Sequence, residues 1–592
     1  MSDQTPGLRE PFTAETPLYT VLRDPRGREL VAAALPQLVG SSILHTLHGY
    51  PVGLVVATEQ GLQDDPAAQA ELLAAIAAID VTTDPPAPER EALVTPRDDY
   101  DDDARGSAEW SADREVPRYG RFELTLRGPS HGNPFVDVTI AARVEGPGVS
   151  VRVPGFYDGE GVYRVRYMPE VEGAFRFTTS SSARSLDGIE GAFTAVPAAP
   201  GSHGPVRVAD TFHFAYADGT RYRPVGTTSY VWTHQGDALE EQTLASLEQS
   251  AFTKMRMCVF PKSYLFNENE PERFPYVGDL ERGFDFQRFS PEYWAHLEKR
   301  IDQLAALGIE ADLILYHAYD RWGFAEMDPV SDDRYLRYVV ARLSSFANVW
   351  WSLANEYDLL YAKTTDDWER FARIVTDEDP HGHLLSIHNC RDFYDYGRPW
   401  ITHASIQRQD VYKTAEMTDQ WREAWGKPVV IDECAYEGDI DQGWGNITGE
   451  EMTRRAWEGA VRGGYVGHGE TYVHPDDILW WAKGGTLHGT SAARLGFLDE
   501  IVSQAPGGVL EPIQIDWDVP RAGIEGQHLL YYFGFNQPTY RRFLTDPATT
   551  WQIDIIDTWA MTIQTLPHTY SGRFRIELPG RQHIAVRLRA VS

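Results

Sequence analysis

The sequence predicts a multidomain protein with a central (β/α)8 TIM barrel, flanked by β-sandwich domains and preceded by a small N-terminal helical module. Three observations support this prediction. The chain has 592 residues, too many for one hydrophobic core. Between residues 204 and 505, short apolar segments alternate with helical segments, as in parallel βα units. On both sides of this region, in residues 116–203 and 506–592, apolar and polar residues alternate, which is typical of antiparallel strands.

Residues 1–80 are predicted to form the helical module. ELVAAALPQLVG and DDPAAQAELLAAIAAID carry apolar residues at helical spacing, and Asp64 or Asp65 before Pro66 is a typical helix start. No residue pattern here indicates chemistry, so we expect docking, homo-oligomerisation or a structural brace. Residues 81–115 are predicted as a linker, because TTDPPAPER and PRDDYDDDAR are too rich in proline and charge to form a core.

Two β-rich regions flank the predicted barrel. Residues 116–203 contain RFELTLRG, FVDVTIAARVEG, VYRVRYMPE and GAFRFTTSSS, whose alternation and Gly/Pro breaks predict a β-sandwich. Residues 506–592 contain HLLYYFGFN, TWQIDIIDTW, SGRFRIELP and QHIAVRLRAV, which predict a C-terminal antiparallel β-domain. We expect the first of these domains to pack against and position the barrel, with carbohydrate binding as the alternative.

The region from 204 to 505 supplies the predicted barrel strands. In chain order they are YRPVGTTSY, FTKMRMCVF, IEADLILYH, VWWSLANEY, HLLSIHN, ITHASIQ, PVVIDECAYE and GYVGHGETY. Helical segments such as PEYWAHLEKRIDQLAALG and GEEMTRRAWEGAVRGG lie between them. In this fold the active site lies at the carboxyl ends of the strands, so polar residues that end these segments are the candidates for chemistry.

Composition narrows the function classes. The formal net charge is −33, which argues against nucleic acid and anionic membranes as partners because both repel an acidic surface. The 17 tryptophans favour stacking on sugar rings, although most aromatic residues must belong to the core. The three cysteines have no metal-site spacing, and no signal peptide or membrane span is evident, so a cytoplasmic protein is expected.

Two glutamates end predicted strands on opposite sides of the barrel mouth. Glu356 follows the fourth strand in NVWWSLANEYD, and Glu433 follows the seventh in KPVVIDECAYEG. A retaining glycosidase needs two carboxyl groups about 5–5.5 Å apart, one protonated and one ionised. Asp432 and Glu437 compete with Glu433 as nucleophile, but Asp432 should face the other side of its strand and Glu437 lies beyond the strand end.

The surroundings of the two glutamates predict how their roles divide. An apolar wall of Trp350, Trp351 and Leu353, with the nearby negative charge of Glu433, is expected to raise the pKa of Glu356. Arg256, which ends the second strand, is expected to keep Glu433 ionised.

These segments resemble the glycoside hydrolases of clan A, whose barrels carry Asn-Glu after strand four and Glu after strand seven. DLILYHAYDRWGF, WWSLANEYD and VVIDECAYEG look closest to the apiosidase-like group, and FYDGEGVYRVRYMPEVEGAFRF resembles the immunoglobulin-like domain that precedes many bacterial glycosidase barrels. The resemblance implies retention through a glycosyl-enzyme intermediate, with Glu356 as acid/base and Glu433 as nucleophile. It also implies that Asn355 binds the sugar 2-hydroxyl and that Arg256 fits the family pattern. For the sugar it suggests a furanose or an unusual pentose, and galactose, glucose and arabinose remain open.

Further polar and aromatic residues end or follow predicted strands and are expected to bind substrate. Neutral amide and imidazole groups suit sugar hydroxyls, which both donate and accept, and a tryptophan after the last strand matches the aromatic platform of clan A. For each polar residue a structural hydrogen bond is the alternative. The set comprises Tyr316, His317, His388, Asn389, His403, Gln407, Glu470, Trp480 and Trp481, with the choice between the two tryptophans left open.

The predicted function is therefore a retaining, exo-acting glycoside hydrolase on small oligosaccharides or glycosides, with no cofactor and no metal. The alternatives are a carbohydrate-binding barrel without turnover and a transglycosylase that uses the same carboxylates. A metal-dependent hydrolase that uses His317, His388, His403 and His468 is disfavoured, because no HxH motif follows the first strand.

Overall fold

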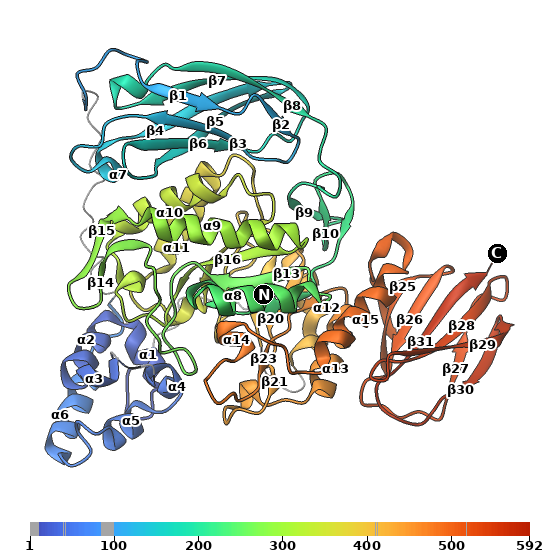
Figure 1. Ribbon diagram of the computed structural model, residues 1–592. Helices are drawn as coiled ribbons and strands as arrows, with labels where there is room; N and C mark the ends of the chain where they lie inside the picture. Colours follow the sequence, from blue (N-terminus) through green and yellow to red (C-terminus); the bar gives the residue numbers. More distant parts are fainter. Residues whose placement is uncertain are drawn as a thin grey trace.

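The computed structural model describes residues 11–39, 41, 43–83, 100–408, 410, 413–516 and 518–591. It contains a helical module, a β-domain, a central curled sheet with helices, and a C-terminal β-domain (Figure 1). Residues 1–10 of the predicted module and residues 84–99 of the predicted linker lie outside the described residues. Within the described ranges, no helix has the length and apolar character that crossing a membrane requires.

The helical module consists of short helices around a small apolar core that includes Val21, Val31 and Ile76. Asp65 accepts hydrogen bonds from the backbone N–H groups of Ala67 and Ala68, which confirms the predicted helix start before Pro66. The helices are α1 (Leu18–Arg23), α2 (Pro25–Ala34), α3 (Pro36–Val39), α4 (Leu44–Leu47), α5 (Val52–Thr58) and α6 (Pro66–Ala77).

The β-domain after the linker region has the strand order β1-β3-β6-β5-β4-β7-β8-β2, and all its pairs are antiparallel except β2 with β8. Alternate residues of β3 are buried, as the pattern of Phe122, Leu124 and Leu126 predicts. Its strands are β1 (Glu109–Ala112), β2 (Glu115–Pro117), β3 (Phe122–Arg127), β4 (Ile140–Gly146), β5 (Val149–Tyr157), β6 (Val162–Tyr167), β7 (Gly173–Ser181) and β8 (Glu190–Val196), with α7 (Pro134–Asp137) between β3 and β4.

The central region is a curled parallel sheet in two sections, and each of the eight predicted segments carries one strand. The first section is β12 (Gly226–Thr228), β13 (Lys254–Cys258), β16 (Glu310–His317), β17 (Val349–Asn355) and β18 (Leu385–Ser386); the second is β19 (Ala404–Gln407), β20 (Val429–Glu433) and β22 (Tyr465–Val466). A parallel bridge between Thr227 and His468 links the end of the second section to the start of the first. Between β18 and β19, the N–H of Thr402 donates to the carbonyl of Leu385 at 2.9 Å.

Helices follow most of these strands. They are α8 (Asp237–Glu248), α9 (Pro291–Ala306), α10 (Pro329–Leu343), α11 (Thr365–Glu378), α12 (Thr418–Trp425), α13 (Gly449–Ala460), α14 (Trp480–Lys483) and α15 (Ser491–Ser503). Residues 387–403, all of them described, form a loop instead of a helix, because RDFYDYGRP places aspartate, glycine and proline close together. Two short strand pairs extend the loops: β14 (Tyr276–Asp279) with β15 (Gly283–Phe289), and β21 (Glu437–Gly438) with β23 (Glu470–Thr471).

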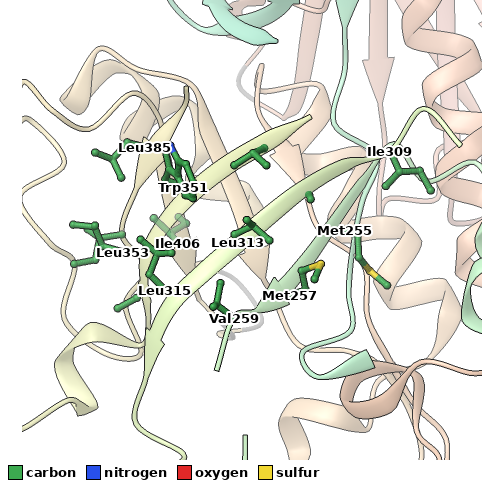
Figure 2. Close-up of a cluster of buried hydrophobic side chains, with 14 of the residues drawn as sticks. Met255, Met257, Val259, Ile309, Leu313, Leu315, Trp351, Leu353, Leu385 and Ile406 are labelled. Atoms are coloured by element: carbon green, nitrogen blue, oxygen red, sulfur yellow. The ribbon is translucent and has the colours of Figure 1, made fainter. Parts of the chain in front are cut away.

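Strand alternation separates an outer apolar face from an inner polar one. Met255, Met257 and Leu313 belong to the buried cluster beneath the helices (Figure 2). Their neighbour Lys254 points inward, where its ammonium lies 2.6 Å from Asp312 and 2.8 Å from Asp432. This ion pairing lets three charged groups lie inside the curled sheet.

An apolar plug closes the amino ends of the central strands. Phe214 and Tyr222 pack against Trp350, at the start of β17, and Val430, at the start of β20. The plug belongs to the small sheet of β9 (Val206–Ala209), β10 (His213–Tyr216) and β11 (Arg221–Tyr222). The central sheet is thus covered at this end, and its carboxyl ends form the opposite side.

The C-terminal domain is antiparallel, as predicted from its alternation. Trp457 of α13 stacks on Tyr532, with ring centroids 5.5 Å apart, which attaches the domain to the central region. Its main sheet is β24 (Pro512–Asp516), β25 (Val519–Ile524), β26 (His528–Tyr532), β31 (Ile584–Val591), β28 (Thr550–Asp557) and β29 (Thr562–Tyr570), and β27 (Tyr540–Leu544) pairs with β30 (Arg573–Glu577).

Candidate active site

A cavity of about 830 Å³ lies at the carboxyl ends of the central strands and contains both predicted glutamates, Glu356 and Glu433. A volume of this size is in the range that accommodates a drug-sized ligand. Polar and aromatic groups dominate its lining, which comprises Ile43, His48, Tyr50, Tyr230, Lys262, Tyr264, Leu265, Tyr319, Cys390, Arg391, Gln407, Arg408, Asp410, Tyr436, Gln442, Gly443, Trp444 and Trp481.

Glu356 follows β17 directly and adopts a left-handed backbone conformation, with φ 53° and ψ 56°. Such conformations are costly for residues other than glycine, and they gather at functional sites. Its carboxylate accepts hydrogen bonds from the Tyr319 hydroxyl and, at 3.2 Å, from Asn355 Nδ2. Burial and the negative charge of Glu433 raise the pKa of Glu356 to about 7.

Glu433 is the last residue of β20, and donors and positive charge surround it. The Tyr230 hydroxyl donates to its Oε1. Arg256 Nη1 lies 3.6 Å and His388 Nε2 lies 3.7 Å from the same oxygen. A hydroxyl donor and a guanidinium charge thus lie beside this carboxylate.

Asn355 joins the two glutamates in one polar network. Its Nδ2 donates to Glu356, and its Oδ1 accepts from Arg256 Nη1 at 2.7 Å and from the Tyr230 hydroxyl at 3.3 Å. Arg256 and Tyr230 also face Glu433, as described above. Asn355, Arg256 and Tyr230 therefore connect the two carboxyl groups of the cavity.

Lys262 lines the cavity but is not among the residues predicted from the sequence. Its ammonium lies 3.6 Å from the ring centroid of Tyr230, 4.2 Å from that of Tyr319 and 5.1 Å from that of Trp481. Burial lowers the pKa of Lys262, while aromatic faces stabilise its cationic form. The signal was present in the sequence, because Lys262 follows the second predicted strand within two residues.

The predicted site residues include two pairs of sequence neighbours, Tyr316–His317 and His388–Asn389. In each pair one side chain lies on the inner side of the sheet and the other turns away from it. Neighbours on a strand point to opposite faces, so one member of each pair turns away. Tyr316 turns outward: its ring stacks on Phe371 of α11 and its hydroxyl donates to Asp332 of α10, which does not fit the predicted contact with substrate. His317 stays on the inner side, with Nε2 3.2 Å from the carbonyl oxygen of Phe260.

The second pair is His388 and Asn389. His388 faces Glu433, and burial together with the charge of Arg256 lowers its pKa well below the usual value, so its imidazole is neutral. Asn389 turns to the backbone of Gln407, donating to its carbonyl at 3.2 Å and accepting from its N–H at 3.1 Å. Asn389 therefore has a structural hydrogen bond in place of the predicted substrate contact, while the side chain of Gln407 lines the cavity.

Two further predicted residues, His403 and Glu470, lie away from the cavity lining. His403 precedes β19 and packs against Phe214 and Trp350 at the plugged end, because it precedes the strand rather than following it. Glu470 accepts from the backbone N–H groups of His488 and Gly489, at 2.5 and 2.8 Å. These positions do not fit the predicted contacts with substrate.

The two consecutive tryptophans also separate. Trp480 Nε1 donates to Thr227 Oγ1 at 2.8 Å, in the packing behind the cavity. Trp481 lines the cavity, where its ring centroid is 4.9 Å from that of Trp444. Of the two tryptophans, Trp481 is thus the one that lines the cavity.

The predicted apolar wall around Glu356 is not formed by the expected residues. Trp351 and Leu353 face the helix side of β17 (Figure 2), and Trp350 belongs to the plug at the opposite end. Tyr264 and Tyr319, from the loops after β13 and β16, line the cavity beside Glu356 instead. The burial that raises the pKa of Glu356 thus comes from residues distant in sequence.

The competing carboxylates have structural partners. Asp432 pairs with Lys254, and although burial would raise its pKa, the charges of Lys254 and Arg256 lower it. Glu437 accepts hydrogen bonds from the backbone N–H groups of Thr490 and Ser491, at 2.8 and 2.9 Å. These contacts explain why neither carboxylate lines the cavity.

Two groups of side chains among the described residues have potential metal-ligating atoms within 4.8 Å of one another: Asp237, Glu240 and His296, and Glu437, His468 and Glu470. In the first group, Arg300 Nε binds Glu240 at 2.6 Å and provides the positive charge there. In the second, hydrogen bonds from the segment 488–491 occupy both carboxylates. Neither group lines the cavity with Glu356 and Glu433.

Comparison with known proteins places this geometry in a family. Residues 210–506, half of the chain, match the family described as apiosidase-like, catalytic domain. Residues 115–182 and 517–589 match two domains of unknown function, DUF5060 and DUF5605. A search of curated proteins found no significant match.

Solved structures resemble the chain as well. A Bacteroides vulgatus ATCC 8482 protein assigned as a glycoside hydrolase is 39% identical with a TM-score of 0.77, covering 81% of this chain and 100% of its own. A glycoside hydrolase family 5 structure from the same organism and a further glycoside hydrolase are each 15% identical with TM-scores of 0.51. They cover 65% and 66% of this chain, and 94% and 98% of their own chains. These two distant similarities show a shared fold.

The family match covers the region that supplies both glutamates and the cavity around them, and the 39% identical structure spans its own full length on this chain. The chain therefore belongs to the apiosidase-like family, and it is a glycoside hydrolase.

Proposed function

We propose that the protein hydrolyses a glycosidic bond with retention of configuration, as the enzymes of clan A do on an eight-stranded barrel. Glu356 is the acid/base and Glu433 the nucleophile. The observation that carries this proposal is the unequal environment of the two carboxyl groups in one cavity. Glu356 has a pKa raised to about 7, whereas Glu433 lies among a hydroxyl donor and a guanidinium.

In the first step Glu433 attacks the anomeric carbon while Glu356 gives its proton to the leaving oxygen. The bond from the anomeric carbon to that oxygen breaks, and an ester forms between the sugar and Glu433. In the second step Glu356 removes a proton from water, which attacks the anomeric carbon and releases Glu433 as a carboxylate. Two inversions give net retention.

The electrostatics of the pair support this cycle. The negative charge of Glu433 contributes to the raised pKa of Glu356, which keeps Glu356 protonated for the first step. When Glu433 becomes an uncharged ester, that contribution disappears and the pKa of Glu356 falls. Glu356 is then better suited to act as the base in the second step.

The surrounding residues suit a sugar ring. Trp481 provides an aromatic surface, the side-chain amide of Gln407 can exchange hydrogen bonds with hydroxyl groups, and Asn355 contacts Glu356. We propose exo action on small oligosaccharides or glycosides, with the furanose or pentose class as the first to examine. No step in this mechanism requires a cofactor.

A screen of aryl glycosides of pentoses and hexoses tests the proposal, with proton NMR to identify the first anomer released. We expect one sugar to be released with the configuration of the substrate. An inverted first product would make Glu433 a base toward water instead of a nucleophile. Transfer of the sugar to an added alcohol in preference to water would favour the transglycosylase, and binding without turnover would favour a carbohydrate-binding protein.

Lys262→Met is expected to move the alkaline limb of kcat/KM to higher pH, by about one unit. Activity requires protonated Glu356 and is lost as pH rises through its pKa. The positive charge of Lys262 lowers that pKa, so its removal raises the pKa and extends activity upward. The pH profile of the variant is compared with that of Lys299→Met, whose side chain is 53% exposed on α9. A limb that stays in place or moves downward would contradict this coupling.

A further inference from the structure

We propose that the helical module, residues 11–83, forms one wall of the subsite for the leaving-group part of the substrate and selects saccharide leaving groups over small ones. This inference rests on the proposed function, because it takes Glu356 to be the acid that protonates the leaving oxygen. It assigns a role to a part of the chain in which the sequence pattern alone indicates no chemistry.

The first observation is that the module contributes side chains to the cavity of Glu356 and Glu433. Ile43, His48 and Tyr50 line it together with the two glutamates. Ile43 is 52% exposed and Tyr50 is 51% exposed, so both large side chains offer surface to a ligand. An aromatic ring and an imidazole are the groups that stack on and hydrogen-bond to sugars.

The second observation is that the module is attached to the loops on the Glu356 side. Arg23 pairs with Asp392 at 2.6 Å, and the Arg391 guanidinium lies 4.9 Å from the ring centroid of Tyr19. Tyr361, five residues after Glu356, packs against the apolar core of the module. Figure 1 shows the module, in blue, against one edge of the central region.

This attachment decides which part of the substrate the module can contact. The acid/base carboxyl of a glycosidase lies beside the leaving oxygen, so the loops that follow Glu356 border the leaving group. A second cavity of about 730 Å³ lies between the module and the loops after β16 and β17, and it shares Tyr319 with the first cavity. The hydroxyl of Tyr319 donates a hydrogen bond to Glu356. The module, the leaving-group side of the cavity and the acid therefore lie near one another.

The third observation concerns the 39% identical relative, which matches over its whole length yet covers 81% of this chain. About a fifth of this chain thus has no counterpart there, a share equal to that of residues 1–113. Both glutamates lie in the region 210–506 that matches the catalytic family. The module is therefore positioned to alter specificity without supplying the reacting groups.

Tyr50→Ala in the full-length chain tests the inference with two kinds of substrate, both made from the sugar that the aryl-glycoside screen identifies. The glycosyl fluoride has a one-atom leaving group that cannot reach the module, whereas the corresponding disaccharide and trisaccharide can. We expect kcat/KM for the oligosaccharides to fall about tenfold, as for the loss of one aromatic contact, and that for the fluoride to stay within about twofold. Tyr50→Phe should retain most of the oligosaccharide activity.

Leu54→Ala is the matched control, because Leu54 is 50% exposed on the same module and does not line the cavity. It should leave both rates unchanged. Equal losses on fluoride and oligosaccharides in Tyr50→Ala, or no loss on either, would overturn the inference while leaving the proposed function intact. A wild-type protein that hydrolyses neither kind of substrate would overturn the proposed function, and the inference with it.

Discussion

Glu433→Ala is expected to lower kcat for aryl glycosides by about 10⁵-fold, the scale seen when a covalent nucleophile is removed. Without this carboxylate no glycosyl ester can form at this position. The nearby carboxylates already have partners: Asp410, which lines the cavity, pairs with Arg408 at 2.6 Å, Asp432 is held by Lys254, and Glu437 by the segment 490–491. Added azide should restore turnover, because a small anion can enter the space vacated by the side chain.

The product distinguishes the mechanism from a general loss of function. In Glu433→Ala, azide attacks from the side of the missing nucleophile while Glu356 protonates the leaving group, so a glycosyl azide of inverted configuration should form. Glu423→Ala, an exposed glutamate on α12, serves as control and should retain wild-type rates. Wild-type activity in Glu433→Ala, or a rescued product of retained configuration, would remove Glu433 from the nucleophile role.

Glu356→Ala is expected to lower kcat/KM about 10³-fold for substrates with poor leaving groups, within the range for loss of a general acid. A leaving group that departs without a proton, such as fluoride or dinitrophenolate, should depend much less on Glu356 in the first step. Hydrolysis of the ester would then be slow, because no base activates water, and a burst of released dinitrophenolate should precede the steady state.

Two measurements complete the test of Glu356. Azide should accelerate turnover of the accumulated ester and give a glycosyl azide of retained configuration, opposite to that from Glu433→Ala. The alkaline limb of kcat/KM, assigned to the pKa of about 7 at Glu356, should disappear in the variant. Persistence of that limb, or equal losses for good and poor leaving groups, would argue that another group is the acid.

The pattern of short apolar segments predicted the central architecture because burial on both faces requires near-continuous apolar strands, whatever lies around them. Each of the eight segments carries a parallel strand, and β17 and β20 end beside the two glutamates. The helix-free loop 387–403, between β18 and β19, departed from the expected alternation of strands and helices. Such connections depend on local capping and turn residues more than on apolar periodicity.

The sequence did not predict correctly which way each side chain at a strand end points. Tyr316 and Asn389 each adjoin a residue on the inner face and themselves turn to structural partners. Strand alternation predicts that one of two neighbours must turn away, but it does not say which until the register and the helix packing are known. His403 has a different cause: β19 begins directly after it, so His403 lies at the amino end of the strand, away from the cavity.

The sequence by itself determined the curled parallel sheet and the strand ends that carry Glu356 and Glu433, because both depend on local periodicity. It also determined the acidic net charge, which argues against nucleic-acid binding, because charge depends on composition alone. Only the tertiary structure decided that Lys262 lies among Tyr230, Tyr319 and Trp481, and that Tyr50 shares a cavity with the glutamates. The physical reason is distance along the chain: these contacts join loops and a module separated by tens to hundreds of residues. Their positions follow from how the elements pack together, and no local pattern in the sequence encodes that packing.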